Sequence, residues 1–357
     1  MEKELKRTVL FNKHQELNAR NVGFGGWEMP VQYEGVIKEH DACRNHAALF
    51  DISHMGEFFY EGDIANSGIN NSCTTDFVKL PVGKCKYGFL LNEKGGVIDD
   101  LIVYKLDETH LMFVVNAARI DVDFKQIKSH IKSGKFENRS DETAKIDIQG
   151  PKSKEILQKL VSFDLGELKF FGFKQTTLLD APAIVSRTGY TGELGYELYV
   201  GNETAEKLWD KLMELGAVPA GLGARDVLRL EKGYSLYGHE LNEETTPAEA
   251  GIDMFVQYDS HDFTGKEALL KQKESGISKK IIAFTTNSKR SPREGFEIYQ
   301  NGQKIGYVTS GTYSPSVGSG IGLGFVDVKL YDKDADLELK TARGSMPIYR
   351  AKLPFLK

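Results

Sequence analysis

Residues 86–106 read KYGFLLNEKGGVIDDLIVYKL, two apolar runs joined by a polar segment that ends in paired glycines. This pattern is typical of a β-hairpin with its turn at residues 92–96. The second run is rich in β-branched residues but contains two adjacent acids, Asp99 and Asp100. Strand side chains alternate between faces, so the two carboxylates are expected on opposite sides. A carboxylate on an apolar strand is costly unless a partner or water compensates it.

The acidic pair has two interpretations. In one, both acids lie near the end of the hairpin, solvated or hydrogen-bonded to turn amides, which fits how rarely charges are buried alone. In the other, one carboxylate lies in a cleft, where it performs acid–base chemistry or orients a substrate. Spacing alone does not separate the two.

The bulk composition is that of an ordinary globular protein, with 357 residues, 40% hydrophobic and 27% charged. The length suggests two or three domains. A net charge of −5 argues against a nucleic-acid binder, which is usually basic. The three cysteines lack metal-like spacing, the start is too charged for a secretory signal, and no apolar run could span a bilayer. We expect a soluble cytoplasmic protein that binds neither nucleic acid nor membrane.

Several elements are expected before the hairpin. The glycine-rich stretch at residues 23–30 lacks the third glycine and the following helix of a dinucleotide site, so it is expected to be a packed turn. Residues 34–48 have helical periodicity, with Val36, Ile37, His40 and Cys43 on one side. A strand is expected from residue 50 to 60, and a helix within residues 63–76.

Histidine and asparagine candidates follow from these elements. His54 could act as a general base, but a lone histidine in a strand is more often structural, because a base needs a positioned partner. Residues 109–116 are expected to form a buried strand that ends at Asn116, where a helix through residue 131 begins. An asparagine at such a junction is commonly an N-cap.

In the second half, short strands are expected at residues 145–149, 183–187 and 196–200. Between the last two lies a glycine-rich loop that includes Tyr190. In the last strand, Tyr196 and Leu198 share one face, so Glu197 on the other face is by itself expected to be a solvent-facing acid.

A further helix is expected at residues 219–231. Arg225 near its start is a candidate anion clamp, whereas Arg229, one turn later, would pair with an acid. The charged residues 271–280 are expected to be a linker. Beyond them the pattern is all strand, with an Asn301-Gly302 hairpin turn, and predicts a small β-barrel or sandwich.

Seven motifs together resemble one family. In their order and spacing they are similar to the aminomethyltransferase, or T-protein, family of the glycine cleavage system, and the resemblance runs from about residue 5 to the C-terminus. The motifs are GWEMP (26–30), FDISHMG (50–56), GGVIDDL (95–101), VVNA (114–117), GYTGE (189–193), GLGARD (221–226) and TSGTYSP (309–315).

The resemblance implies an α+β fold, a three-domain cloverleaf with mixed or antiparallel α/β domains and a C-terminal all-β barrel. The first domain would combine residues 1–50 and 145–270, the second would be residues 51–144, and the barrel residues 280–357. The implied reaction releases ammonia from an aminomethyl group on the dihydrolipoyl arm of H-protein. The one-carbon unit passes to the co-substrate tetrahydrofolate, giving 5,10-methylenetetrahydrofolate. The partner supplies the lipoyl group, and no metal is needed.

The resemblance also implies residue roles. Asp100 resembles the catalytic aspartate beside the reacting folate nitrogens, and Glu197 resembles the acid that holds the pterin ring. The remaining folate-binding positions are Met55, Tyr87, Tyr104, Asn116, Tyr190 and Arg225.

Elementary chemistry agrees with the two acidic roles. A pterin presents an amino group and a ring N–H side by side, a donor pair that one carboxylate can accept. A carboxylate near the reacting carbon would stabilise an iminium-like cation and accept a proton. Arg225 could meet either the pterin or the anionic glutamyl tail.

Two departures from the family pattern stand out. The chain ends at Lys357, before a tyrosine that some longer relatives carry, and Phe170 and Phe171 stand where some relatives have tyrosines. Three alternatives also remain open: a folate-dependent demethylase of the same superfamily, a folate-binding relative that assists iron–sulfur assembly, and a catalytically silent binding protein. The motif series, the cysteine contexts and the presence of Asp100 argue against them in turn.

Overall fold

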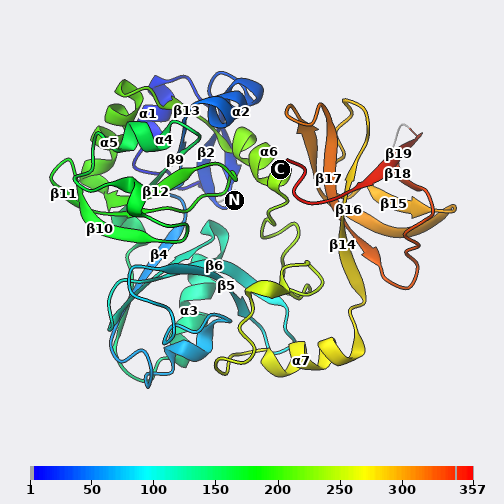
Figure 1. Ribbon diagram of the computed structural model, residues 1–357, viewed down its shortest axis with the longest axis horizontal. Helices are drawn as coiled ribbons and strands as arrows, with labels where there is room; N and C mark the ends of the chain where they lie inside the picture. Colours follow the sequence, from blue (N-terminus) through cyan, green and yellow to red (C-terminus); the bar gives the residue numbers. More distant parts are fainter. Residues whose placement is uncertain (1–3, 342–343, 357) are drawn as a thin grey trace. The chain divides into compact units, whose positions relative to one another are not determined.

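The computed structural model describes residues 4–341 and 344–356 (Figure 1). The chain divides into two compact units: Met1–Gly88 with Leu101–Asp226, and Phe89–Asp100 with Val227–Lys357. The division passes through the hairpin of β5 (Cys85–Leu91) and β6 (Val97–Lys105), which confirms the hairpin prediction, and through helix α6 (Leu222–Lys232).

A six-stranded sheet lies in the first unit, with strand order β10-β11-β12-β9-β3-β13. Only β13 pairs in parallel among these strands; the other pairings are antiparallel. The strands are β3 (Ala48–Asp51), β9 (Thr143–Gln149), β10 (Phe173–Leu178), β11 (Ala181–Ser186), β12 (Gly195–Gly201) and β13 (Val218–Pro219). The accompanying helices are α1 (Phe11–Glu16), α2 (Val36–Asn45), α4 (Ser153–Leu157) and α5 (Asn202–Glu214).

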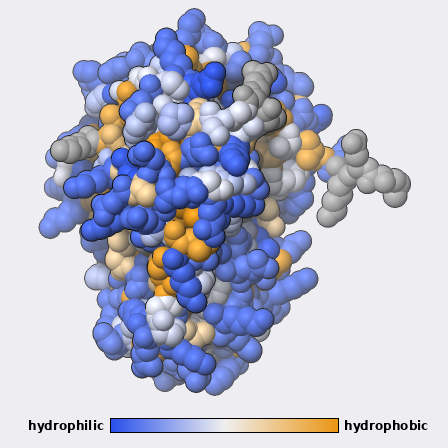
Figure 2. All heavy atoms as spheres, turned by 90° about the vertical axis from the view of Figure 1, so that its right-hand side faces the viewer, coloured by the Kyte–Doolittle hydropathy of each residue, from blue (hydrophilic) through white to orange (hydrophobic). Residues whose placement is uncertain are grey.

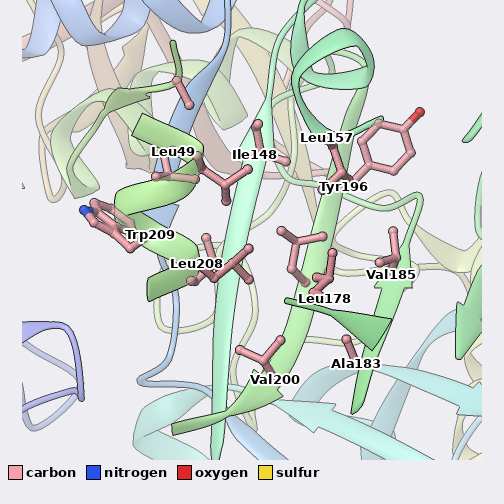
Figure 3. Packing of buried hydrophobic residues seen from close by; sticks show 14 of the residues in the cluster. Leu49, Ile148, Leu157, Leu178, Ala183, Val185, Tyr196, Val200, Leu208 and Trp209 are labelled. Atoms are coloured by element: carbon pink, nitrogen blue, oxygen red, sulfur yellow. The ribbon is translucent and has the colours of Figure 1, made fainter. Parts of the chain in front are cut away.

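One face of this sheet packs against α5. Figure 3 shows Leu208 and Trp209 of α5 beside Ile148 of β9, and these side chains are completely buried together with Leu198 of β12. Side-chain alternation then turns Glu197 to the opposite face, as predicted. That face is covered as well, and Glu197 is only 3% exposed. The expectation that Glu197 faces solvent is therefore wrong.

A second sheet has the strand order β5-β6-β7-β4-β8. Its remaining strands are β4 (Gly56–Glu61), β7 (His110–Val115) and β8 (Lys135–Asn138), and helix α3 spans Ile120–His130. The predicted buried strand at residues 109–116 is confirmed by β7. Asn116 occupies the N-cap position of a 3₁₀ turn, η2 (Ala117–Arg119), as predicted, although its side chain makes no capping hydrogen bond to the turn.

The chain between β3 and β4 differs from the prediction of one strand over residues 50–60. The Asp51 carboxylate accepts the Ser53 N–H at 2.9 Å, and the Met55 N–H donates to the Ile52 carbonyl at 3.2 Å. Such local hydrogen bonds compete with a strand ladder. The turn they form carries His54, which is thus not in a strand.

Three smaller expectations also fail. The predicted helix within residues 63–76 is reduced to the 3₁₀ turn η1 (Ile69–Ser72). The predicted linker is helix α7 (Lys266–Ser275), followed by strand β14. In α2, Ile37 does not share the buried side of the helix with His40 and Cys43, since it is 60% exposed. Glu39 is buried instead, and its carboxylate accepts the N–H groups of Tyr33 and Gly35.

The second unit contains a closed barrel, β14-β17-β16-β15-β18-β19, drawn in orange and red in Figure 1. Its antiparallel strands are β14 (Lys279–Thr285), β15 (Glu297–Gln300), β16 (Gln303–Ser314), β17 (Ser319–Asp327), β18 (Leu337–Thr341) and β19 (Gly344–Ala351). Phe284, Ile298 and Leu339 are among its buried core residues. Asn301 and Gly302 connect β15 to β16 with φ of 51° and 79°, so the predicted barrel and hairpin are confirmed.

The glycine-rich stretch forms the hairpin of β1 (Arg20–Phe24) and β2 (Trp27–Gln32), with Gly25 and Gly26 at positive φ. The remaining 3₁₀ turns are η3 (Ser140–Glu142), η4 (Leu165–Glu167) and η5 (Asp253–Phe255). Hydrophilic residues cover most of the face in Figure 2, with small groups of hydrophobic residues between them. In the described part of the chain, no helix is long and apolar enough to cross a membrane.

Candidate functional site

The Glu197 carboxylate lies in a buried polar cluster on the face of the six-stranded sheet opposite α5. Its Oε1 lies 3.2 Å from the Nζ of Lys145, which comes from the neighbouring strand β9. Its Oε2 accepts the Thr188 hydroxyl at 2.7 Å and the Tyr199 hydroxyl at 3.2 Å. Burial disfavours the charged carboxylate, but Lys145 and these hydrogen bonds outweigh it and hold the pKa of Glu197 below its usual value.

Tyr104, one of the predicted folate-site residues, reaches the same carboxylate from β6. Its hydroxyl lies 3.4 Å from Glu197 Oε2 and 2.9 Å from the Tyr199 hydroxyl. Burial raises the pKa of both tyrosines well above the usual value, so both remain neutral hydrogen-bond donors. The Oε2 atom is thus surrounded by three hydroxyl groups, whereas Lys145 is the partner of Oε1 among the described residues.

A second ion pair joins Arg225 to Asp147, with 2.8 Å between Nη1 and Oδ2. The Arg225 guanidinium also lies over the ring of Tyr190, 5.1 Å from its centroid, which is a cation–π arrangement. Asp147 is completely buried, and burial raises the pKa of its carboxyl to about 6 against the opposing effect of Arg225. The two predicted residues Arg225 and Tyr190 are therefore brought together.

The other predicted residues have varied surroundings. The Met55 Sδ lies 3.5 Å from Lys145 Nζ, which places Met55 beside the Glu197 cluster. Tyr87 is half-buried on β5, where its carbonyl accepts the Thr75 hydroxyl at 3.4 Å. Asp100 is half-buried on β6, whereas Asp99 is completely buried. Asp99 is therefore not solvated, which excludes that part of the first interpretation for this acid.

Arg229 has the role that its spacing predicted. It is buried in the second unit, with Nη1 3.2 Å from the Glu240 carboxylate and Nη2 donating to Ser310 at 2.8 Å. The expectation that it pairs with an acid is confirmed.

Sequence reasoning missed Lys145, Asp147 and Gln149, which alternate along β9 and are all buried. A signal was present, because a strand with a polar residue at every second position has one wholly polar face. When such a face is buried, its polar groups need partners, so it marks either a structural network or a binding site.

Two buried titratable groups lie near this network. Glu57 is completely buried, and neither of its carboxylate oxygens has a hydrogen-bond partner among the described residues. Burial raises the pKa of Glu57 well above its usual value, which favours the neutral carboxyl. Burial also lowers the pKa of His54 to about 4, so its imidazole is uncharged at neutral pH.

The side chains of this cluster do not form a metal centre within residues 4–341 and 344–356. No group of three or more His, Cys, Asp or Glu side chains in these ranges could hold a metal ion. The cluster instead offers a charged carboxylate, neutral hydroxyls and a guanidinium beside an aromatic ring. Groups of this kind suit an organic ligand with N–H donors and an anionic part.

Comparison with known proteins covers nearly the whole chain. The family models described as GCVT N-terminal domain and Glycine cleavage T-protein C-terminal barrel domain match residues 10–260 and 279–357. A relative named aminomethyltransferase from Thermoanaerobacter sp. (strain X514) is 47% identical over 342 residues, covering 94% of this chain and 93% of the relative. Its counterpart from Thermotoga maritima is 47% identical over 337 residues, 92% of each protein.

A solved structure agrees with these sequence relatives. The crystal structure of glycine cleavage system aminomethyltransferase T from Bartonella henselae is similar to this chain with a TM-score of 0.92 and 31% identity. The similarity covers 99% of this chain and 98% of that one, so it includes both the α/β part and the barrel.

Proposed function

The chain belongs to the glycine cleavage T-protein family, and on this premise we propose how its own residues bind folate and assist the transfer. The activity is that of an aminomethyltransferase of the glycine cleavage system, a folate-dependent transferase. The aminomethyl group would arrive on the dihydrolipoyl arm of H-protein. Tetrahydrofolate would leave as 5,10-methylenetetrahydrofolate.

The proposed reaction exchanges four bonds at one carbon. The C–N bond breaks and releases ammonia, and the C–S bond breaks and returns the dihydrolipoyl thiol. The carbon forms new bonds to two folate nitrogens, each of which gives up one proton. Nitrogen and sulfur take up those two protons, so the reaction needs no oxidant or reductant.

The ionised Glu197 carboxylate is the observation that carries the folate assignment. It is buried, charged and held by Lys145, yet Oε1 has one lone pair beyond the contact with that lysine. A pterin N–H could donate to this oxygen with the strength of a charge-assisted hydrogen bond. Tyr104 borders the same carboxylate and Met55 borders its partner Lys145, so both side chains would line the ligand.

The anionic part of folate suggests a role for Arg225. Asp147 neutralises part of its charge, and its guanidinium keeps N–H groups beyond the one directed at Asp147. Its guanidinium lies over the Tyr190 ring. We assign Arg225 and Tyr190 together to folate binding, along with Tyr87 and Asn116 from the family resemblance.

Asp100 is the proposed catalytic group. A carboxylate would stabilise the cationic carbon formed as ammonia leaves and would accept a proton from the attacking nitrogen. Asp99, its neighbour, is completely buried. Asp100 is half-buried, so it is the acid of the pair that keeps part of its surface accessible to solvent.

The proposed three-domain organisation has support from the sheets. The six-stranded sheet takes its strands from residues 48–51, 143–149 and 173–219, which agree with the discontinuous first domain except at residues 51 and 143–144. The five-stranded sheet takes its strands from residues 56–138, which match the second domain. The barrel falls within the third.

Tetrahydrofolate titration of the Glu197→Gln variant tests the folate assignment. The amide places a donor where the pterin also donates and removes the charge, so a charge-assisted bond of about 1.5–3 kcal/mol is lost. The dissociation constant should rise about ten- to a hundredfold. Glu206→Gln, at an exposed position of α5, is the control. Equal folate affinity in the wild type and the Glu197 variant would refute the assignment.

A further inference from the structure

Gln149 is a buried amide at the end of β9 that fills a slot between two glycines. A Cβ atom built on Gly189 would lie 2.2 Å from Gln149 Oε1, and one built on Gly195 would lie 2.1 Å from Gln149 Cδ. Both distances are far shorter than a van der Waals contact, so any side chain at either position would displace Gln149. The two glycines at the ends of the Tyr190 loop therefore allow this amide to enter.

Three hydrogen bonds hold the Gln149 amide in the slot. Its Nε2 donates to the Thr188 carbonyl at 3.0 Å and to the Asp147 carboxylate, and its Oε1 accepts the Thr191 hydroxyl at 2.8 Å. Because both partners at one end are acceptors, that end must be the NH₂ group, which fixes the orientation of the amide. Gln149 is completely buried, so these bonds are not exchanged with water.

Each of these three contacts leads to a residue that the proposed function assigns to folate. The Thr188 hydroxyl donates to Glu197 Oε2 at 2.7 Å. The bonds to Thr188 and Thr191 fix the backbone on both sides of Tyr190. Asp147 accepts from Arg225, whose guanidinium lies over the Tyr190 ring.

We propose that Gln149 is a positioning residue for folate binding, which locks the Tyr190 loop and aligns Glu197, Tyr190 and Arg225 through Thr188, Thr191 and Asp147. This inference rests on the proposed function, since it assumes that these three residues bind folate. Gln149 itself does not touch the reacting atoms. Its loss should therefore weaken folate binding much more than it slows turnover at saturating folate.

The packing of the Gln149 amide against Gly195 is tested without ligand by a double-mutant cycle of Gln149→Ala and Gly195→Ala. In the wild-type background, Gly195→Ala should lower the melting temperature because its methyl group displaces the buried amide. In the Gln149→Ala background the obstacle is gone, so the same change should lower the melting temperature much less. Equal effects of Gly195→Ala in both backgrounds would show that the amide does not fill the slot, and would overturn the inference.

The functional part is tested by folate titration and kinetics of Gln149→Leu. Leucine has a similar volume but lacks all three hydrogen bonds, so the dissociation constant and KM for tetrahydrofolate should rise about tenfold. The rate at saturating folate and the KM for H-protein should stay within about twofold of wild type.

Gln158→Leu is the matched control. Gln158 also clamps a loop in the first unit, because its Nε2 donates to the Phe163 carbonyl at 2.7 Å and its Oε1 accepts the Leu165 N–H at 2.9 Å. This loop carries no proposed folate residue, so its loss should lower stability without changing folate affinity. A general loss of stability would instead affect folate binding equally in both variants, which would overturn the positioning role.

The Glu197→Gln titration separates failure of this inference from failure of the proposed function. Weakened binding in the Glu197 variant with unchanged binding in Gln149→Leu would overturn the role of Gln149 alone. Unchanged binding in both variants would overturn both the role of Gln149 and the folate assignment.

Discussion

At the scale of single residues, the site depends on charges that compensate one another inside the protein. Glu197 keeps its charge because Lys145 and three hydroxyls replace the water it lost. Asp147 and Arg225 form a second pair, and burial raises the pKa of Glu57. Removing one partner of a buried pair typically costs about 3–5 kcal/mol, because the other charge is left uncompensated. The cluster is thus a stable arrangement that presents an ionised carboxylate.

His54 should make the stability of the protein depend on pH. Its pKa is lowered to about 4 in the folded protein, from an ordinary value of 6.5. Between these values the unfolded chain binds a proton that the folded protein does not, so stability falls as the pH decreases from 6.5 towards 4. From pH 7 to pH 5 this contributes a loss of about 2 kcal/mol, which the non-titrating His54→Asn variant should lack.

Urea unfolding at the two pH values measures this contribution. The exposed His46→Asn variant is the control and should lose as much stability as the wild type. If the His54 variant loses as much stability as wild type between pH 7 and pH 5, its ring is not held uncharged by burial.

The sequence predicted the chemical character of the site residues better than it predicted their surroundings in the fold. Glu197 and Tyr104 were correctly placed on strands, but the sequence alone suggested solvent for Glu197, because a second apolar layer over that sheet face arises from distant parts of the chain. The partners of Glu197 show the same limit. Lys145 and Thr188 lie 52 and 9 positions away from it in the sequence; the register of β9 against β12 brings Lys145 to it, and the loop after β11 brings Thr188.

At the scale of elements, the local sequence predicted a turn correctly where the turn requires particular residue types. Asn301 and Gly302 both take positive φ, as their residue types predicted. The strand predicted over residues 50–60 failed because the Asp51 carboxylate forms a local turn. The predicted linker failed because Lys, Glu, Ala, Leu and Gln are good helix formers, and the burial of Leu269 supplies the packing that α7 needs.

The β15–β16 hairpin gives a prediction for the barrel. Gly302 has φ of 79°, and a Cβ there would meet no atom within 4 Å, so Gly302→Ala adds backbone strain without a clash. Such strain costs about 1–2 kcal/mol per residue. The variant should unfold at lower urea concentration, while Asn301→Gly, which tolerates the same φ of 51°, should not. Equal stability of Gly302→Ala and wild type would contradict the assigned turn geometry.

At the scale of the whole molecule, the family motifs predicted more of the fold than the secondary-structure propensities of the residues could. Periodicity indicated strands, helices and a barrel, but the discontinuous pairing of β3 with β9 and β13 cannot be read from local pattern. The family resemblance supplied only a first domain built from two separate stretches of chain, without the pairing of its strands. The agreement with both family models and with a solved structure along nearly the full chain confirms the fold class.

The proposed delivery of the substrate by H-protein gives a prediction about which substrates support turnover. A free aminomethyl group is unstable, so the substrate should be delivered on a lipoyl arm. We expect turnover with lipoylated H-protein and none with the same protein lacking lipoate, measured as formation of methylenetetrahydrofolate. Efficient transfer from free methylated small molecules would instead favour a demethylase.

Ammonia release from aminomethylated H-protein, followed with and without tetrahydrofolate, tests the role of Asp100 directly. Wild-type release should depend strongly on folate. Asp100→Asn keeps the size of the side chain but removes the charge and the proton acceptor, so its folate-dependent rate should fall about 10²–10⁴-fold. Asp99→Asn, at the buried neighbour, should lose far less activity. An Asp100→Asn rate above about a tenth of wild type would contradict the account, as would an inactive Asp99→Asn beside an active Asp100→Asn.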